Sequence, residues 1–249
     1  MPEFVRTELI FGRRPVVEVL RGPRRVFQIF LTEPAKNFLQ REMRKHGISK
    51  DFRLSVVSKQ YLYNLIKRPD HQGIVARAEE FEYTPLDIII DRQPEILVLA
   101  EGITDPHNLG AIIRSANLCG AGGVIIPTKN SAQITPVVVH TSAGATEHTP
   151  IARAESLAHT LGVLKDRGYT VIISDKPSPN SVPITRFEPA GKIAVVMGSE
   201  GEGVSGKVRR KGDVIVSIPQ AGEIDSFNVS VAAGIILFYT AHRLGILGE

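Results

Sequence analysis

The chain of 249 residues has little cysteine and few aromatic residues: one Cys, no Trp, and an aromatic content of 6%. A single cysteine excludes an internal disulfide framework. No apolar run approaches the roughly 20 residues that a membrane-spanning helix needs. Charged residues interrupt positions 1–15, so that no signal-peptide pattern opens the chain. We therefore expect a soluble, cytoplasmic protein without a membrane partner.

Metal-ligand and nucleophile patterns are missing as well. The seven histidines and Cys119 show no metal-ligand spacing, and no Ser-His-Asp arrangement can be recognised. Internal repeats and low-complexity segments are also absent from the sequence. The sequence thus predicts no metal site, and Cys119 is interpreted as a small buried side chain.

The charge of the chain is uneven. Residues 1–79 contain 16 Lys and Arg against 8 Asp and Glu, whereas the remaining residues contain 14 against 18. Lys and Arg that neutralise phosphates supply most nonspecific affinity for nucleic acids, so this asymmetry favours a polyanion as the partner of the first part. A solvated basic surface is the alternative, and charge alone leaves both interpretations open.

Hydrophobic periodicity divides the chain into two α/β domains. The stretch 80–94 brackets an apolar patch with acidic residues and two prolines, so the linker is placed at 80–93, between domains at 1–79 and 94–249. In the first domain we expect a small α/β unit with strands at 25–32, 54–57 and 73–79 and helices at 35–47 and 58–67.

Five apolar runs alternate with helical stretches in the second domain, at 95–101, 122–127, 169–175, 192–198 and 213–219. Runs of Ile, Val and Leu that are apolar on both faces are typical of buried parallel strands covered by helices. The predicted fold is therefore α/β, with a mostly parallel sheet flanked by helices. In such sheets ligands bind at the carboxyl ends of the strands, so the residues after each run are the candidate site.

The first candidate segment begins after the run 95–101. Asp105 is suited to cap a helix whose buried face is formed by Leu109, Ile112, Ile113 and Ala116. Arg114 lies on another stripe of this helix. Two interpretations of Arg114 stay open: an ordinary surface arginine, or a cation directed toward a phosphate or a reacting oxygen.

The second candidate segment is a glycine-rich loop. Gly201–Lys207 matches the G-x-x-x-x-G-K pattern of phosphate-binding loops, but Val208 stands where such a loop needs Ser or Thr to hold magnesium. The next strand ends at Pro219 instead of a metal-binding Asp. Glycines after a strand still allow the backbone to approach a ligand closely, and Glu200 among them is an unusual core residue.

The third candidate segment, 217–234, leads into the last predicted helix, which Gly245 can end. Asn228 and Ser230 are set among apolar residues, and a polar group taken from water without a partner costs on the order of 1 to 3 kcal/mol. Three strand ends therefore converge on one candidate site, where something must satisfy Asn228 and Ser230.

Three motifs, taken in order, carry a resemblance to a known family: NLGAIIR at 108–114, VMGSEGEGVS at 196–205 and SIPQAGEIDSFNVSVAAG at 217–234. With them the second domain resembles the SpoU/TrmH family of RNA ribose 2′-O-methyltransferases, of the SPOUT superfamily. Through IFGRRPVVEVL and HQGIVARAE, the first domain resembles that family's substrate-binding extension of ribosomal-protein-like α/β fold. The architecture is similar to enzymes that methylate a guanosine of large-subunit ribosomal RNA.

The resemblance implies a trefoil knot in the second domain, S-adenosylmethionine as cofactor, a homodimer, and RNA, ribosomal RNA first, as partner. The residues that it implies for the cofactor pocket are Gly198, Gly201, Ile218, Pro219, Phe227 and Asn228. Those that it implies for catalysis are Arg114, Asn108, Glu200, Ser230 and Asn228. Asn228 and Ser230 would then be polar because they face cofactor and ribose. The family often has Met at the position of Gln220 and Leu at that of Phe227, so this chain departs from it there.

The expected chemistry needs no metal, because the sulfonium of the cofactor already activates the methyl group and the enzyme has to align a ribose hydroxyl with it. A guanidinium resists deprotonation, so Arg114 is expected to position a phosphate and stabilise charge, while an RNA phosphate or water receives the proton. Transfer RNA as substrate, a noncatalytic RNA-binding module and a nucleotide-hydrolysing enzyme are the alternatives left open.

Overall fold

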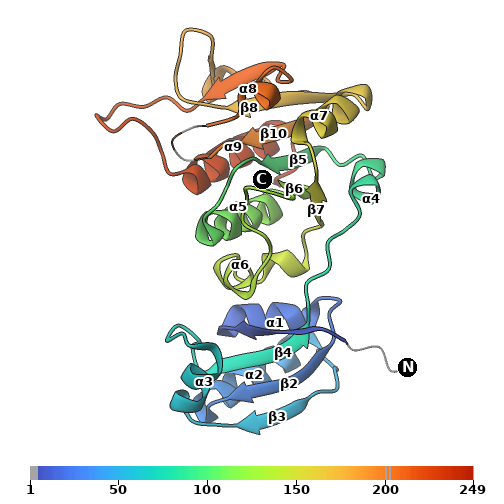
Figure 1. The fold of residues 1–249 in the computed structure, drawn as a ribbon, viewed down its shortest axis with the longest axis vertical. Coiled ribbons are helices and arrows are strands. Elements are labelled where there is room, and N and C mark those ends of the chain that lie inside the picture. The colour runs from blue at the N-terminus through green and yellow to red at the C-terminus, as the bar shows by residue number, and fades with distance from the viewer. Residues whose placement is uncertain (1–4, 200, 202, 249) are drawn as a thin grey trace. The chain divides into compact units, whose positions relative to one another are not determined.

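The computed structural model describes residues 5–199, 201 and 203–248. The chain forms two compact units (Figure 1), one made of Met1–Glu82 with Ile134–His148 and the other of Tyr83–Gln133 with Thr149–Glu249. The division differs in two places from the ranges expected from the sequence. Residues 134–148 pack with the first unit, and α4 (Leu86–Asp91), inside the expected linker, contributes Ile89 and Ile90 to the core of the second.

The first unit is built on a four-stranded sheet in the order β1-β4-β2-β3. Its strands are β1 (Thr7–Phe11), β2 (Val26–Leu31), β3 (Arg53–Val56) and β4 (Ile74–Glu79). β4 is antiparallel to β1 and β2, and β2 is parallel to β3. The expected strands are confirmed, and β1 at the edge of the sheet is additional.

Three helices of the first unit cover the two faces of this sheet unequally. α1 (Arg13–Arg21) and α2 (Glu33–His46) pack on one face, over a cluster that includes Ile10, Ile29 and Ala76. α3 (Lys59–Ile66) packs on the other face, over a smaller cluster. The expected helices at 35–47 and 58–67 are confirmed, whereas α1 was not predicted.

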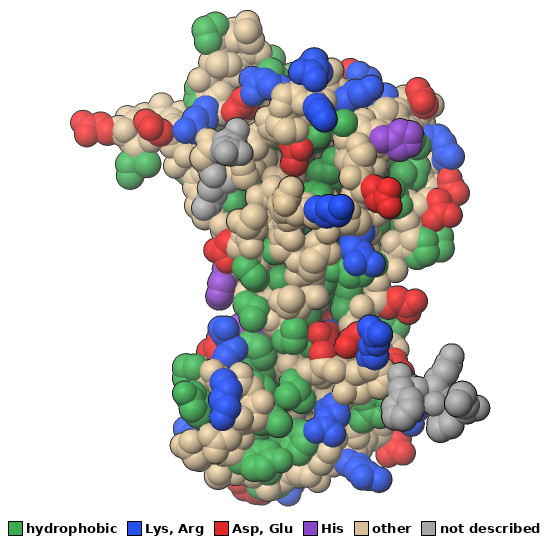
Figure 2. Space-filling view, in the orientation of Figure 1, with side chains coloured by type: hydrophobic (Ala, Val, Ile, Leu, Met, Phe, Trp, Pro, Cys, Tyr) green, Lys and Arg blue, Asp and Glu red, His purple; other side chains and the backbone are tan. Residues whose placement is uncertain are grey.

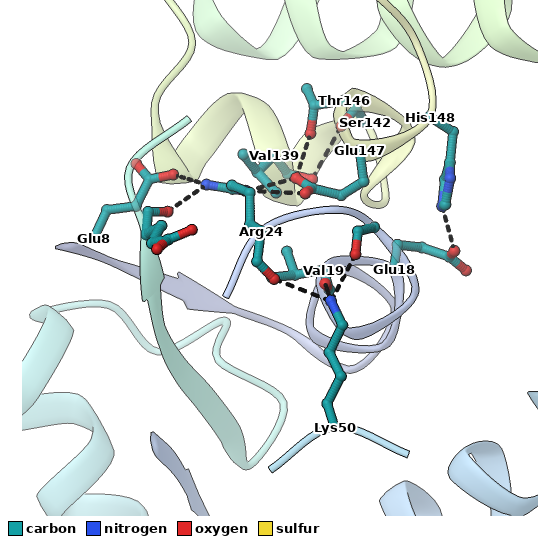
Figure 3. Close-up of polar contacts among 12 residues, drawn as sticks. Glu8, Glu18, Val19, Arg24, Lys50, Val139, Ser142, Thr146, Glu147 and His148 are labelled. Carbon is teal, nitrogen blue, oxygen red and sulfur yellow. Dashed lines mark hydrogen bonds and ion pairs between the residues drawn. The ribbon is translucent and has the colours of Figure 1, made fainter. Parts of the chain in front are cut away.

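The segment 134–148 completes the first unit with α6 (Pro136–Thr141) and the 3-10 helix η1 (Ala145–Glu147). Arg24, which is 6% exposed, forms ion pairs with Glu8 and with Glu147, its Nε lying 2.9 Å from Glu147 Oε2 (Figure 3). Burial raises the pKa of Glu8, although Arg24 acts against this. Lys50 Nζ donates to three backbone carbonyls at the end of α1, which fixes the turn that carries Arg24.

The second unit contains a seven-stranded sheet in the order β7-β6-β5-β10-β8-β11-β9, and its paired strands are parallel. The strands are β5 (Ile96–Ala100), β6 (Val124–Pro127), β7 (Ile151–Ala154), β8 (Tyr169–Ser174), β9 (Val182–Pro183), β10 (Lys192–Met197) and β11 (Val214–Ser217). All five expected strands are confirmed. β7 and β9, which are short, were not predicted.

Helices flank this sheet: α5 (Pro106–Leu118), α7 (Leu157–Asp166), α8 (Gly206–Arg209) and α9 (Val229–Arg243), with a 3-10 turn η2 (Ile184–Arg186). α9 packs against α5, so the last helix of the chain lies beside the helix that follows β5. β10 pairs with β5 on one side and with β8 on the other, which places a late strand between two earlier ones. The carboxyl ends of these parallel strands meet at one edge of the sheet. The trefoil knot stays a prediction from the resemblance.

Candidate functional site

A cavity of about 450 Å³ lies at the carboxyl ends of β8, β10 and β11 and at the start of α9. Of the six residues predicted for a cofactor pocket, five line it: Gly198, Gly201, Ile218, Phe227 and Asn228. Pro219 does not. The three candidate segments were expected to converge, and the second and third meet directly in this cavity because their strands are close neighbours in a parallel sheet.

The glycine-rich loop folds back on the end of β10. Ser199 and Gly203 exchange two backbone hydrogen bonds of 3.1 Å, and a Cβ atom on Gly198 would lie 2.3 Å from the Gly203 backbone, a distance that only glycine avoids. Glu101, which follows β5, accepts hydrogen bonds from the backbone N–H of Ser205 at 2.8 Å and from its hydroxyl at 2.7 Å. Glu101 therefore anchors the carboxyl end of the loop. Glu200, predicted for catalysis, lies outside the described residues.

Asn228 begins α9 and joins the first candidate segment to the third. Its Oδ1 accepts hydrogen bonds from the backbone N–H of Ser230 at 2.9 Å and from the Ser230 hydroxyl at 2.6 Å, and its Nδ2 donates to Asn108 Oδ1 at 3.1 Å. Asn228 is exposed and Ser230 is half-buried. The polar groups are thus satisfied by helix capping and by each other. The structure brings together Asn108, Asn228 and Ser230, three of the five residues predicted for catalysis.

The structure does not bring Arg114 into this cluster. The helix α5 begins as expected, with Asp105 Oδ1 accepting from the backbone N–H of His107 at 2.8 Å. Arg114 is exposed on α5 and does not line the cavity. It lies six residues after Asn108, which corresponds to a rise of about 9 Å and a rotation of about 240°.

Two charged residues of the cavity were missed from the sequence. Asp175 and Lys176 directly follow β8 and line the cavity, and Asp175 forms an ion pair with Arg209 of α8. Asp175 is the last residue of the predicted run 169–175 and Lys176 follows it, at a strand end where ligands of a parallel sheet are expected.

Cys119 is buried, as predicted, and burial raises the pKa of its thiol. In the part of the chain that the structure describes, no group of three or more His, Cys, Asp or Glu could hold a metal ion. Among the same residues, no helix is both long and apolar enough to cross a membrane.

Family comparisons match both units. Residues 95–238 match the SpoU rRNA Methylase family, and residues 9–84 match the substrate-binding domain of RNA 2′-O ribose methyltransferases. YacO of Bacillus subtilis (strain 168), whose name assigns it to the TrmH family of tRNA/rRNA methyltransferases, is 31% identical over 97% of this chain and 98% of its own length. An uncharacterized tRNA/rRNA methyltransferase of Mycolicibacterium vanbaalenii is 37% identical over 95% of this chain and 77% of its own length.

Solved structures share the fold. The SpoU methyltransferase AviRb from Streptomyces viridochromogenes, in complex with the cofactor AdoMet (S-adenosylmethionine), has a TM-score of 0.77 at 25% identity, over 98% of this chain and 92% of AviRb. An AdoMet-bound rRNA methyltransferase from Sinorhizobium meliloti has a TM-score of 0.75 at 24% identity, over 96% of this chain and 88% of that one. The predicted α/β fold class and the predicted family are confirmed. The chain belongs to the SpoU rRNA Methylase family and is a methyltransferase of that family.

Proposed function

We propose that the protein transfers the methyl group of S-adenosylmethionine to a ribose 2′-hydroxyl of structured RNA. The observation that carries this proposal is the cavity of about 450 Å³ at the strand ends of the second unit, bordered by the Asn108–Asn228 contact. Its volume lies within the range of small-molecule and cofactor sites. Membership of a methyltransferase family supports the same conclusion.

The residues that line the cavity fit this cofactor. Asp175 and Lys176 offer a carboxylate and an ammonium, which complement the amino and carboxylate groups of its methionine part. Ile218 and Phe227 offer apolar surface for the adenine ring, and Gly198 allows close backbone approach. When bound, the cofactor supplies a methyl group that a positively charged sulfur already activates.

The chain's own residues would align the nucleophile and manage one proton. The ribose 2′-oxygen would receive the methyl group that the cofactor supplies and would lose its hydroxyl proton, while the cofactor's sulfur would become neutral. Asn108, Asn228 and Ser230 form a polar cluster at the cavity border that can orient the ribose hydroxyl. We propose that Glu200 helps to orient the ribose and the glycine-rich loop. An RNA phosphate oxygen or water would receive the proton.

We assign to Arg114 the positioning of an RNA phosphate, because its guanidinium is exposed and the planar fork matches the geometry of phosphate oxygens. Arg114→Ala should leave cofactor affinity and folding unchanged and lower methyl transfer by roughly a hundredfold, the scale of a lost transition-state contact. Arg114→Lys should rescue poorly because it lacks the planar fork. Single-turnover transfer on saturating RNA measures both variants, and a wild-type rate for the alanine variant would remove Arg114 from the mechanism.

For the substrate we propose a guanosine of large-subunit ribosomal RNA, on the motif resemblance and on the basic charge of residues 1–79. Transfer RNA is the alternative, since the names of both relatives include tRNA and rRNA. We propose a cytoplasmic location with either substrate. The test is methylation of total RNA with labelled cofactor, with and without a metal chelator, followed by mapping of the modified ribose. Absence of cofactor binding by calorimetry at millimolar concentration would refute a catalytic role and favour a noncatalytic RNA-binding module.

We also propose a homodimer through the second unit. Leu118 of α5 and Val231 and Phe238 of α9 are 69%, 49% and 59% exposed, on two helices that pack together. Apolar side chains gathered on neighbouring helices favour an interface. Phe238→Glu should produce a monomer in sedimentation, whereas Ile88→Glu, a change at an exposed apolar side chain of α4, should not.

A further inference from the structure

One face of the sheet in the first unit is only partly covered. On the face that carries α3, the eight residues of this helix pack over Phe11, Phe30 and Val75. Next to that covered part, strand register aligns one residue from each of the four strands, because Leu9 is opposite Arg77, Arg77 opposite Gln28, and Gln28 opposite Arg53. We call these four residues the open row. In Figure 1 no helix is drawn over β4, β2 and β3 in this view, and α3 lies at one end of the strands.

The open row carries two arginines. Arg53 and Arg77 are exposed, and in the described part of the chain neither has an ion-pair partner. The Arg77 guanidinium lies 5.8 Å from the centre of the Phe30 ring. Glu79 shares this face of β4, but one of its oxygens accepts a hydrogen bond from the backbone N–H of Arg25. In Figure 2, the surface of the first unit shows Lys and Arg side chains among uncharged and hydrophobic atoms.

An exposed aromatic ring borders the open row. Tyr61 of α3 is 46% exposed, and its ring centre lies 5.8 Å from that of Phe30, the ring over which Arg77 is placed. Gln28 lies between the two arginines, and its Nε2 donates to Ser55 Oγ at 3.1 Å. The surface therefore combines cations, an amide and a ring face within the width of one small sheet.

We propose that the open row, together with Tyr61, binds an unpaired stretch of the RNA substrate. This inference rests on the proposed function, and it names the surface and the kind of RNA. Arg53 and Arg77 lie two strands apart, which corresponds to a backbone separation of about 10 Å at the usual spacing of strands. In the proposed complex, both arginines contact phosphates. Tyr61 stacks on a base, as exposed aromatic side chains do with unpaired nucleotides.

Charge and geometry favour this occupant over others. A second copy of the chain, seated by two-fold symmetry, would bring the same arginines against each other. A fully paired duplex keeps its bases inside the helix, so that Tyr61 would have no base to stack on. The excess of Lys and Arg in residues 1–79 supplies the long-range attraction that a polyanion needs.

The test uses the full chain and three labelled RNAs: a hairpin with a single-stranded loop, the loop sequence as an unpaired oligonucleotide, and a duplex of the same length. Affinity is measured by fluorescence anisotropy over a range of salt concentrations. The double variant Arg53→Gln/Arg77→Gln should bind the hairpin about tenfold or more weakly, with a salt slope lower by about 1.4. Tyr61→Ala should weaken binding about fivefold or more. The control Arg44→Gln changes an exposed arginine of α2, on the covered face, and should stay within about twofold of wild type.

Two results would overturn the proposal. Hairpin affinity unchanged in the double variant and in Tyr61→Ala would show that RNA binds elsewhere on the chain. Equal losses for duplex and hairpin would show that the surface does not select unpaired nucleotides. Circular dichroism and calorimetry with S-adenosylmethionine accompany each variant, so that folding and the cofactor site are followed separately. If the wild-type chain binds the cofactor and methylates RNA, and the variants bind RNA with wild-type affinity, only the RNA-binding role of the open row is refuted. If the wild-type chain neither binds the cofactor nor methylates RNA, the proposed function is refuted.

Discussion

Substitution of Asn228 separates the capping of α9 from the link to α5. In Asn228→Ala, the backbone N–H groups of Ser230 and Val231 lose their acceptor, and Asn108 loses its donor. Replacing an N-cap Asn by Ala costs about 0.5 to 2 kcal/mol, and an additional hydrogen bond about 0.5 to 1.5 kcal/mol. The free energy of unfolding should therefore fall by about 1 to 3 kcal/mol, which urea denaturation measures.

Asn228→Ser keeps one of these roles and removes the other. Serine is as good an N-cap as asparagine, but its side chain is too short to reach Asn108. The free energy of unfolding should therefore fall only by the lost hydrogen bond to Asn108, about 0.5 to 1.5 kcal/mol. Cofactor affinity and the single-turnover rate of methyl transfer should still fall, because the border of the cavity loses the contact between α9 and α5.

The two variants together make the reasoning refutable. Equal loss of stability in the alanine and serine variants would show that Asn228 does not stabilise α9 as a cap. A wild-type transfer rate in Asn228→Ser would show that the contact with Asn108 has no part in the reaction. A double-mutant cycle between Asn228→Ala and Asn108→Ala should give a coupling energy of about 0.5 to 1.5 kcal/mol.

Three further substitutions test parts of the structure that surround the two sites. Arg24→Met leaves the nearly buried carboxylate of Glu147 without a cation, so the free energy of unfolding should fall by about 3 to 5 kcal/mol in urea; a loss below about 1 kcal/mol would contradict the burial of this pair. Glu101→Ala frees the end of the glycine-rich loop and should raise the KM for the cofactor with little change in kcat, which steady-state kinetics would show. Burial raises the pKa of Tyr169 to about 12. Folding therefore favours the neutral Tyr169 hydroxyl, which donates to the Pro94 carbonyl, and the stability that its burial adds is present below about pH 10 and lost as the pH rises through about 12. Tyr169→Phe should not show this loss of structure at alkaline pH when folding is followed by circular dichroism.

The second unit was largely predictable because its signals are local. Each central strand is a run apolar on both faces, and Asp105 and Pro106 mark the start of α5. The pocket positions of Gly198 and Ile218 were implied by the motif resemblance; Gly198 directly follows β10 and Ile218 directly follows β11. The short edge strands β7 and β9 were missed, since four and two residues carry too little pattern.

The details of the site were less predictable. The resemblance explains the polar Asn228 by a contact with cofactor and ribose, although Asn directly before a helix is a common N-cap. The structure leaves it exposed and satisfies it within the chain. For Arg114 the sequence pattern indicated the face of the helix but not its surroundings. The rotation of α5 against its neighbours decides what that face contacts.

The membership of residues 134–148 in the first unit had no local signal at all, because the contact between Arg24 and Glu147 spans 123 residues. This segment changes what a truncation can test. Deleting residues 1–79 to remove RNA binding would also expose Val139, which is fully buried in the core of the first unit, and leave Glu147 without Arg24. The shortened chain should therefore be cleaved within 134–148 under limited proteolysis while its cofactor affinity is retained. Full protection of that segment would show that it folds without residues 1–79. The deletion would then test RNA binding by the first unit as cleanly as the variants of the open row do.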